Sequence, residues 1–238
     1  MTDRTEELFR QDSYRKSCDA TVVEVNDRGG IVLDKTVFYY TGGGQPGDSG
    51  TLRFDGSEIR IATTVQAEGD IIHVPEEGQT LPPVGTAVTA EIDWDRRYKL
   101  MKMHTAMHLL CSIVPCGVTG GQVGEEKSRL DFDVGDHTLD KDALTNELNR
   151  LVAEDHALET FWITDAELDG NPDLVRTMSV QPPRGSGKVR LVKIGDAVDL
   201  QPCGGTHLAH TGEIGLLRVG KIENKGARNR RVNIHLEG

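Results

Sequence analysis

The pattern of apolar residues changes abruptly at Trp94 and Asp95, which divides the chain into two parts with different local preferences. Before this point, segments rich in β-branched and aromatic residues alternate with turn signals such as Asp55-Gly56 and Glu68-Gly69. These segments are 21–26, 31–40, 59–66, 70–74 and 86–93. Several short strands at this spacing predict a small antiparallel, barrel-like β domain over residues 1–95.

After Asp95 the apolar residues recur at helical spacing. Leu100, Met103, Met107 and Leu110 predict a helix from about 95 to 114, which Pro115 ends. A second helix is expected over residues 139–158. Strands are expected at 128–134, 160–168, 188–194, 216–222 and 230–236. Helices inserted among strands that do not alternate with them favour an α+β domain over 96–238, with helices packed on an antiparallel sheet.

Composition excludes several classes of protein. The 238 residues are 27% charged and 37% hydrophobic, as in ordinary soluble globular chains. The chain contains no apolar run of about 18 residues, so no membrane-spanning helix is predicted. Its first residues lack the apolar segment of a secretory signal peptide. Four cysteines without an evident framework suit a reducing compartment, so a cytoplasmic location is expected. The oligomeric state is left open.

The net charge of −11 at first argues against a nucleic-acid partner. Residues 1–95, however, hold 18 acidic and 8 basic side chains, whereas 96–238 hold 20 and 19. Residues 216–235 contain six basic side chains and a single acid, Glu223. A local basic surface for phosphates is therefore compatible with the sequence, and a solvated basic face is the alternative.

Two pairs of potential metal ligands stand out. His104 and His108 are four residues apart, so on a helix they share one face at the edge of the apolar stripe. Cys203 and His207 lie in Q-P-C-G-G-T-H, where proline and glycine predict a tight loop. Each pair alone is weak evidence, because HxxxH is common on helix surfaces and in cores.

Three imidazoles and one thiolate form a donor set that tetrahedral Zn²⁺ accepts, so one zinc ion per chain is expected. Because 94 residues lie between the pairs, the fold must bring them together. Cys111 is close on the same helical wheel and is an alternative ligand, although a small core residue is the plainer interpretation. The HExxH glutamate of metallopeptidases is missing, since Thr105, Ala106 and Met107 separate the histidines.

These motifs resemble those of a known family. R96-R-Y-K-L-M-K-M-H-T-A-M-H-L-L followed by Q201-P-C-G-G-T-H is similar to the paired zinc motifs of the alanyl-tRNA synthetase editing domain and of the free-standing, AlaX-type editing proteins. The likeness includes T41-G-G-G-Q-P-G-D-S-G, S128-R-L-D-F-D and H210-T-G-E-I-G, and it spans roughly residues 37–238. The chain resembles the medium-length form, with an N-terminal β domain before the editing domain.

The resemblance implies a zinc-dependent hydrolase that deacylates Ser-tRNA(Ala), and in some members Gly-tRNA(Ala). Zinc can lower the pKa of a bound water or hold the substrate, but four protein ligands are more typical of a closed structural site. The catalytic base is left unassigned. One alternative is a tRNA-binding module with a structural zinc and no turnover. Another is a deacylase for a different mischarged tRNA, such as one carrying threonine.

The resemblance also suggests residues that contact the substrate. Gln122 and Thr119 are candidates for an amino-acid pocket that recognises the serine hydroxyl, with a polar turn as the alternative. Gly43 and Gly44 could allow close approach of the terminal nucleotides, although a hairpin loop explains them equally well. The expected RNA contacts are Arg96, Arg97, Lys221, Arg228 and Arg230.

Overall fold

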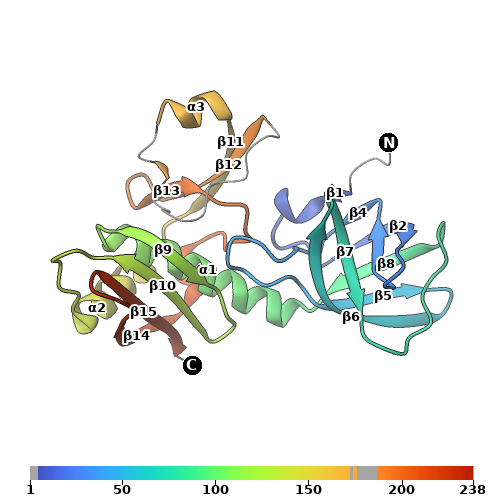
Figure 1. Cartoon of the computed structure of the whole chain (residues 1–238), viewed down its shortest axis with the longest axis horizontal. Helices are drawn as coiled ribbons and strands as arrows, with labels where there is room; N and C mark the ends of the chain where they lie inside the picture. The colour runs from blue at the N-terminus through green and yellow to red at the C-terminus, as the bar shows by residue number, and fades with distance from the viewer. Residues whose placement is uncertain (1–4, 172–173, 176–186, 238) are drawn as a thin grey trace. The chain divides into compact units, whose positions relative to one another are not determined.

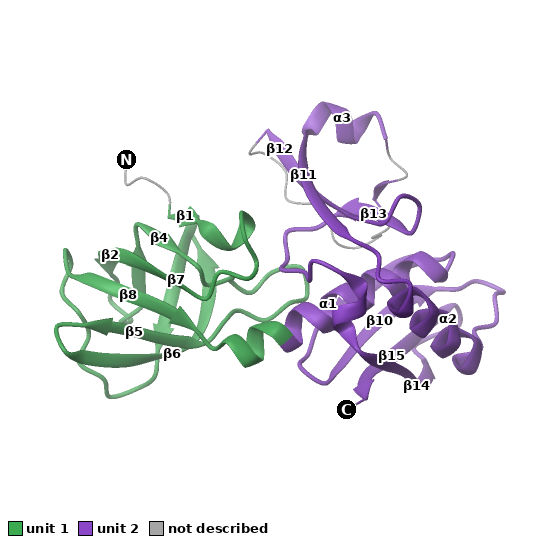
Figure 2. Cartoon of the chain, turned by 180° about the vertical axis from the view of Figure 1, so that it is seen from behind, with its two compact units in different colours: residues 1–98 green, residues 99–238 purple. Residues whose placement is uncertain are grey.

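Six antiparallel strands close into a barrel in the order β2-β3-β7-β6-β5-β8, within the first of two units, residues 1–98 (Figure 2). The strands are β2 (Ser17–Val25), β3 (Ile31–Leu33), β5 (Gly50–Phe54), β6 (Ser57–Ala67), β7 (Asp70–Pro75) and β8 (Ala87–Ile92). Here and below, the computed structural model describes residues 5–171, 174–175 and 187–237. The predicted barrel-like β domain is confirmed.

Alternation of side chains along the strands explains the barrel core. In β8, Val88, Ala90 and Ile92 are buried, and the residues between them are at least partly exposed. The strand predicted over 31–40 is shorter in the structure. It divides into β3 and the two-residue β4 (Lys35–Thr36). Strand β4 pairs in parallel with β1 (Glu6–Glu7), and β1 is followed in the sequence by the one-turn helix η1 (Leu8–Arg10). Val37 and Phe38 then enter the core as irregular chain.

The second unit, residues 99–238, contains two antiparallel sheets and their helices (Figure 1). One sheet has the strand order β14-β15-β10-β9, and the other has the order β11-β12-β13. Their strands are β9 (Gly117–Gln122), β10 (Lys127–Asp133), β11 (Leu158–Thr164), β12 (Lys188–Ile194), β13 (Asp199–Pro202), β14 (Leu216–Asn224) and β15 (Asn229–Glu237). The helices are α1 (Trp94–Ile113), which begins within the first unit, α2 (Lys141–Ala153), α3 (Asp165–Asp169) and η3 (Thr211–Ile214). The predicted α+β class is confirmed.

Local signals set the ends of the shorter helices. The carboxylate of Asp140 caps α2 by accepting from the backbone N–H groups of Asp142 and Ala143. The helix ends at Ala153, five residues before the predicted end, and Asp155 adopts a positive φ of 52°. The strand predicted over 160–168 ends at Thr164, because Thr164 and Glu167 form a capping box that starts α3. Among the described residues, none of the helices is both long and apolar enough to cross a membrane.

The glycine-rich segment 41–50 is a compact turn followed by two close backbone contacts. Gly43 and Gly44 have φ of 55° and 82°, a region that favours glycine, within a turn closed by Gly42 and Gln45. A Cβ at Gly47 would lie 1.9 Å from the Thr64 carbonyl oxygen, and one at Gly50 would lie 2.2 Å from that of Glu91. Turn geometry and backbone packing therefore account for these glycines within the barrel unit.

A buried histidine in the barrel makes its stability depend on pH. His73 is fully buried, with Nδ1 3.0 Å from the Ile31 carbonyl oxygen and Nε2 2.8 Å from the Thr36 hydroxyl. Burial lowers the pKa of His73 to about 4, although the bond to Ile31 opposes this shift. The unfolded chain has a histidine pKa of about 6.5, so on acidification it takes up the proton first.

We therefore expect the barrel to lose about 1.4 kcal/mol of unfolding free energy per pH unit between about pH 6.5 and 4 on account of His73. His73→Gln, which stays uncharged, should reduce this slope. Urea unfolding of both proteins between pH 7.5 and 4.5, monitored by barrel fluorescence, measures the difference. Parallel pH profiles for the two proteins would contradict the assignment.

Candidate metal centre

Helix α1 presents His104 and His108 on one face, one turn apart. Each is only 5% exposed, and the neighbouring Leu100, Met103 and Ala106 are fully buried. The apolar stripe therefore anchors the helix in the core and leaves the two imidazoles beside it, as the sequence predicts. The helix runs from Trp94 to Ile113, one residue earlier at each end than predicted.

The loop that carries Cys203 and His207 is held in place by Arg190 of β12. The Nη1 group of Arg190, which is 5% exposed, donates to the carbonyl oxygens of Cys203 at 3.0 Å and Gly205 at 2.9 Å. At the far end, the Thr105 hydroxyl of α1 lies 3.3 Å from His207 Nδ1 and accepts from the backbone N–H of Leu208 at 3.3 Å. The loop is thus bonded both to its own sheet and to the histidine helix.

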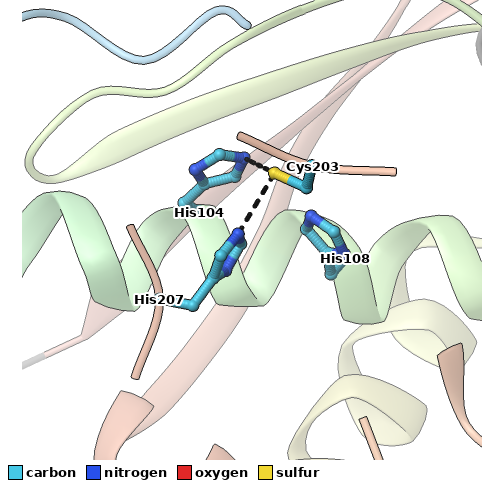
Figure 3. Close-up of side chains that lie close together, drawn as sticks. All are labelled: His104, His108, Cys203 and His207. Atoms are coloured by element: carbon cyan, nitrogen blue, oxygen red, sulfur yellow. Dashed lines mark hydrogen bonds between the residues drawn. The ribbon is translucent and has the colours of Figure 1, made fainter. Parts of the chain in front are cut away.

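The two pairs meet in one cluster, in which the three histidines are buried and Cys203 is partly exposed (Figure 3). Potential ligand atoms of His104, His108, Cys203 and His207 all lie within 4.8 Å of one another. Cys203 Sγ is 3.5 Å from His104 Nε2 and 3.2 Å from His207 Nε2. Bonds of 2.0–2.3 Å to a tetrahedral metal put neighbouring donor atoms about 3.3–3.8 Å apart. The donor set, and the separations of Cys203 from His104 and His207, therefore fit a tetrahedral metal ion.

Asp199 and Gln201 form the outer layer of this cluster. Asp199 Oδ2 is 2.8 Å from His108 Nδ1, and the Gln201 side-chain amide donates to the same oxygen at 2.8 Å. An acceptor at Nδ1 holds the proton there and directs Nε2 of His108 towards the cluster. Neither residue was predicted from the sequence. A retrospective signal is their spacing, since Asp199 and Gln201 share a face of strand β13 and Cys203 follows directly after the strand at the same two-residue spacing.

The electrostatics of the cluster favour an anionic sulfur. Burial raises the pKa of the Cys203 thiol, but His104 and His207 outweigh it and bring the pKa well below its usual value. Burial lowers the pKa of His108, but its hydrogen bonds to Asp199 and Cys203 outweigh burial and raise this pKa to about 10. Burial and the neighbouring His104 lower the pKa of His207 to about 3. These shifts favour a thiolate at Cys203 and a proton on His108, and a metal cation bound there would displace a proton from its ligands.

The outer layer leads to a prediction about metal affinity. Asp199→Ala should weaken zinc binding roughly 10- to 100-fold, because His108 loses the acceptor that orients it. Asp196→Ala is a matched control, since that carboxylate lies three residues away in an exposed position. Competition with a chelator at fixed pH gives both dissociation constants. Equal affinities for the two variants would remove Asp199 from this role.

Cys111 is not part of the cluster among the described residues, and it is buried on helix α1 with 7% exposure. Of the two ligand arrangements that the sequence leaves open, the geometry favours the four-residue set with Cys203. Cys111 fits the interpretation as a small core residue.

The structure does not bring Gln122 to the cluster. Gln122 is exposed, and its amide oxygen accepts from Arg129 Nε at 3.3 Å. A Cβ on the preceding Gly121 would lie 3.2 Å from Met107 on helix α1, so alternation along β9 turns Gln122 to the opposite face of the sheet. Thr119 is occupied elsewhere: its hydroxyl donates to the Asp131 carbonyl at 3.1 Å and accepts from Asn229 at 2.9 Å. Both residues lie within strand β9, so the polar turn is not formed there, and their side chains bond to residues of β10 and β15.

Of the basic residues expected to contact RNA, Arg97 is placed where RNA cannot reach it. Its side chain is fully buried, and it donates to both oxygens of the Asp48 carboxylate and to the Val37 carbonyl. We therefore correct its expected role to a structural one. Arg96 is half-buried and donates to the Gly47 carbonyl at 2.8 Å.

The remaining basic residues of that set lie on strands β14 and β15 and the turn between them. Lys221 is exposed, and the Arg228 side chain is 71% exposed beside Asp133 at 3.0 Å. Arg230 is half-buried, and its Nη1 donates to the backbone carbonyls of Gly226 and Asn229. Lys221 and Arg228 therefore remain available for phosphate contact, because an exposed ion pair exchanges at little cost.

Comparison with known protein families now adds to this geometry. The family model described as "Threonyl and Alanyl tRNA synthetase second additional domain" matches residues 189–233, which include Cys203 and His207. A second model, "tRNA synthetases class II (A)", matches residues 8–96, which include the barrel. Fold and site therefore define a domain of the class that threonyl and alanyl tRNA synthetases carry.

Individual relatives narrow the class to a family. Alanyl-tRNA editing protein AlaX-M of Methanosarcina mazei is 37% identical, over 98% of this chain and 96% of that protein. Alanyl-tRNA editing protein AlaX-L of Pyrococcus horikoshii is 31% identical, over 92% of this chain and 55% of that protein. Alanine–tRNA ligase of Pyrobaculum neutrophilum is 39% identical, over 92% of this chain and 25% of the ligase. The chain belongs to the AlaX family of alanyl-tRNA editing proteins.

Proposed function

We propose that this protein edits alanyl-tRNA by hydrolysing Ser-tRNA(Ala), and Gly-tRNA(Ala) as a second substrate, with one Zn²⁺ held by His104, His108, Cys203 and His207. The observation that carries the proposal is the convergence of three imidazoles and a thiolate from two distant segments into one cluster. Membership of a family whose relatives are named as alanyl-tRNA editing proteins supports the substrate class.

In the proposed reaction, water attacks the ester carbonyl carbon, the bond to the ribose oxygen breaks, and that oxygen takes up a proton. When bound, zinc supplies a Lewis acid that can hold or polarise the aminoacyl group. The chain's residues provide a preorganised site. Asp199 orients His108, Arg190 fixes the Cys203 loop, and burial shields the three imidazoles from bulk water. Asp199 acts here as an orienting group, because its Oδ2 bonds to both His108 and Gln201.

The decisive experiment is to incubate zinc-loaded protein with Ser-tRNA(Ala), Gly-tRNA(Ala) and Ala-tRNA(Ala), and to follow amino-acid release. We expect rapid release of serine, release of glycine, and slow release of alanine. Tight tRNA binding without release would instead favour the other function that a four-ligand site allows, a tRNA-binding module with a structural zinc. Thr-tRNA is added as a fourth substrate, and release of threonine alone would identify the alternative deacylase.

We further propose that Lys221 and Arg228 contact tRNA phosphates, because both are exposed in the basic segment 216–235. The logarithm of tRNA affinity should then fall linearly with the logarithm of salt concentration, and each alanine variant should reduce the slope by about one. Titrations at several concentrations between about 50 and 200 mM salt measure this. Slopes that match the wild type would exclude both residues.

A further inference from the structure

Strand β11 forms an edge of the three-stranded sheet and exposes two consecutive aromatic side chains. Phe161 is 39% exposed and Trp162 is 49% exposed, and most of the other residues of β11 are also exposed. Since successive side chains of a strand point to opposite faces, only one of the two can lie on the face that carries the metal ligands. The register of the sheet identifies which one.

Trp162 lies in the same cross-strand row as a metal ligand. Trp162 is paired with Arg190 on β12. The pairing of β12 with β13 continues to Cys203, whose backbone N–H donates to the Arg190 carbonyl at 3.0 Å. Directly opposite residues of antiparallel strands share a face. Two strand spacings of roughly 4.8 Å put the Trp162 backbone about 10 Å from that of Cys203.

The rest of this face supports the assignment. Asp199 and Gln201, which contact His108, precede Cys203 at two-residue spacing and so share its face with Trp162. Phe161 is opposite Leu191, which is paired in turn with Pro202, so all three lie on the other face. An exposed indole thus lies on the face of the sheet that carries Cys203, and the exposed phenyl ring of Phe161 lies on the opposite face.

We propose that Trp162 is the stacking platform for the terminal base of the RNA substrate. This inference rests on the proposed function, in which the scissile ester is carried by the ribose of the terminal adenosine. With the ester at the cluster, the adenine lies one sugar away, and Trp162 lies two strand spacings from Cys203 on the same face of the sheet. Stacking on an aromatic side chain is the general means by which proteins hold an unpaired base.

The kinetic test compares three variants in the zinc-loaded protein. Trp162→Ala should lower kcat/KM for Ser-tRNA(Ala) roughly 5- to 100-fold, mainly through KM, with zinc content unchanged. Trp162→Phe should retain most of the activity, because a phenyl ring still stacks. Phe161→Ala is the matched control and should behave as the wild type. Equal effects of Trp162→Ala and Phe161→Ala would overturn the proposal.

A binding experiment tests the stacking role of Trp162 without catalytic turnover. The chain has two tryptophans, and Trp94 lies in the first unit stacked on Tyr98, so Trp94→Phe leaves Trp162 as the single indole reporter. A minihelix RNA that accepts alanine, carries no amino acid and ends in CCA should quench the Trp162 fluorescence. The same minihelix ending in CC should quench this fluorescence much less. Equal quenching by both RNAs, or no change on saturating binding, would overturn the stacking role.

The two tests also separate the proposals from each other. Quenching that depends on the terminal adenosine, in a protein that releases no serine, would retain the platform and refute the hydrolase. Release of serine without such quenching would retain the hydrolase and refute the platform. A Trp162 emission that is already blue-shifted without RNA, and insensitive to it, would show that another part of the chain covers the indole and would contradict the proposal.

Discussion

Cys203→Ala is expected to abolish zinc binding and deacylation together. The variant removes the one anionic donor of the cluster, and the three remaining imidazoles leave the charge of the ion uncompensated at a buried site. The loss should exceed the roughly 10- to 100-fold effect expected for an outer-layer residue. Metal content by atomic absorption and serine release from Ser-tRNA(Ala), measured on the same sample, check both parts.

Cys111→Ala is the control for this experiment, because Cys111 is a buried cysteine of helix α1 that lies outside the cluster. It should keep about one zinc per chain and wild-type activity. If Cys111→Ala lost the metal and Cys203→Ala kept it, the ligand set would be wrong. If Cys203→Ala lost zinc but retained deacylation, the metal would be structural only.

The second large effect is expected at the ion pair between Arg97 and Asp48. The two side chains are 0% and 1% exposed, and both carboxylate oxygens accept from the guanidinium. Removal of one partner leaves a buried charge without compensation, which typically costs about 3–5 kcal/mol. Asp48→Ala should therefore lower the unfolding free energy of the barrel unit by about that amount in urea titrations.

Two further variants make this prediction specific. Arg96→Ala, one residue earlier and half-buried, removes a hydrogen bond to the Gly47 carbonyl but leaves no fully buried charge unpaired, so it should cost less than Asp48→Ala. The double variant Asp48→Leu/Arg97→Met replaces the ion pair by apolar side chains and should recover most of the loss. A double variant no more stable than Asp48→Ala would show that packing, and not the unpaired charge, dominates.

Much of the fold could be predicted because its signals are local. The alternation in β8 and the helical spacing of Leu100, Met103 and Met107 are properties of short segments, and both elements occur where expected. Strand β13 was missed because it is four residues long and merges into a proline- and glycine-rich loop. The division of 31–40 was missed because Val37 and Phe38 are as apolar as strand residues but pack without a strand partner.

The candidate site divides in the same way. The four residues of the cluster could be predicted because each pair has a local spacing that suits one ion. Arg97 and Gln122 could not be placed, because their surroundings depend on Asp48 and Arg129, which come from other strands or loops. A basic residue at the start of a helix looks the same in the sequence whether it faces solvent or a buried carboxylate. The outer-layer role of Asp199 likewise depends on contact with His108, 91 residues away.

Because 94 residues lie between the two ligand pairs, a bound metal would also lower the conformational entropy of the unfolded chain. An ion held by His108 and Cys203 closes a loop almost as long as a small domain, and long closed loops restrict the unfolded ensemble most. The ion therefore acts as a reversible cross-link, comparable with a disulfide but set by the free zinc concentration. The thermal stability of the second unit should follow zinc availability logarithmically, while that of the barrel does not.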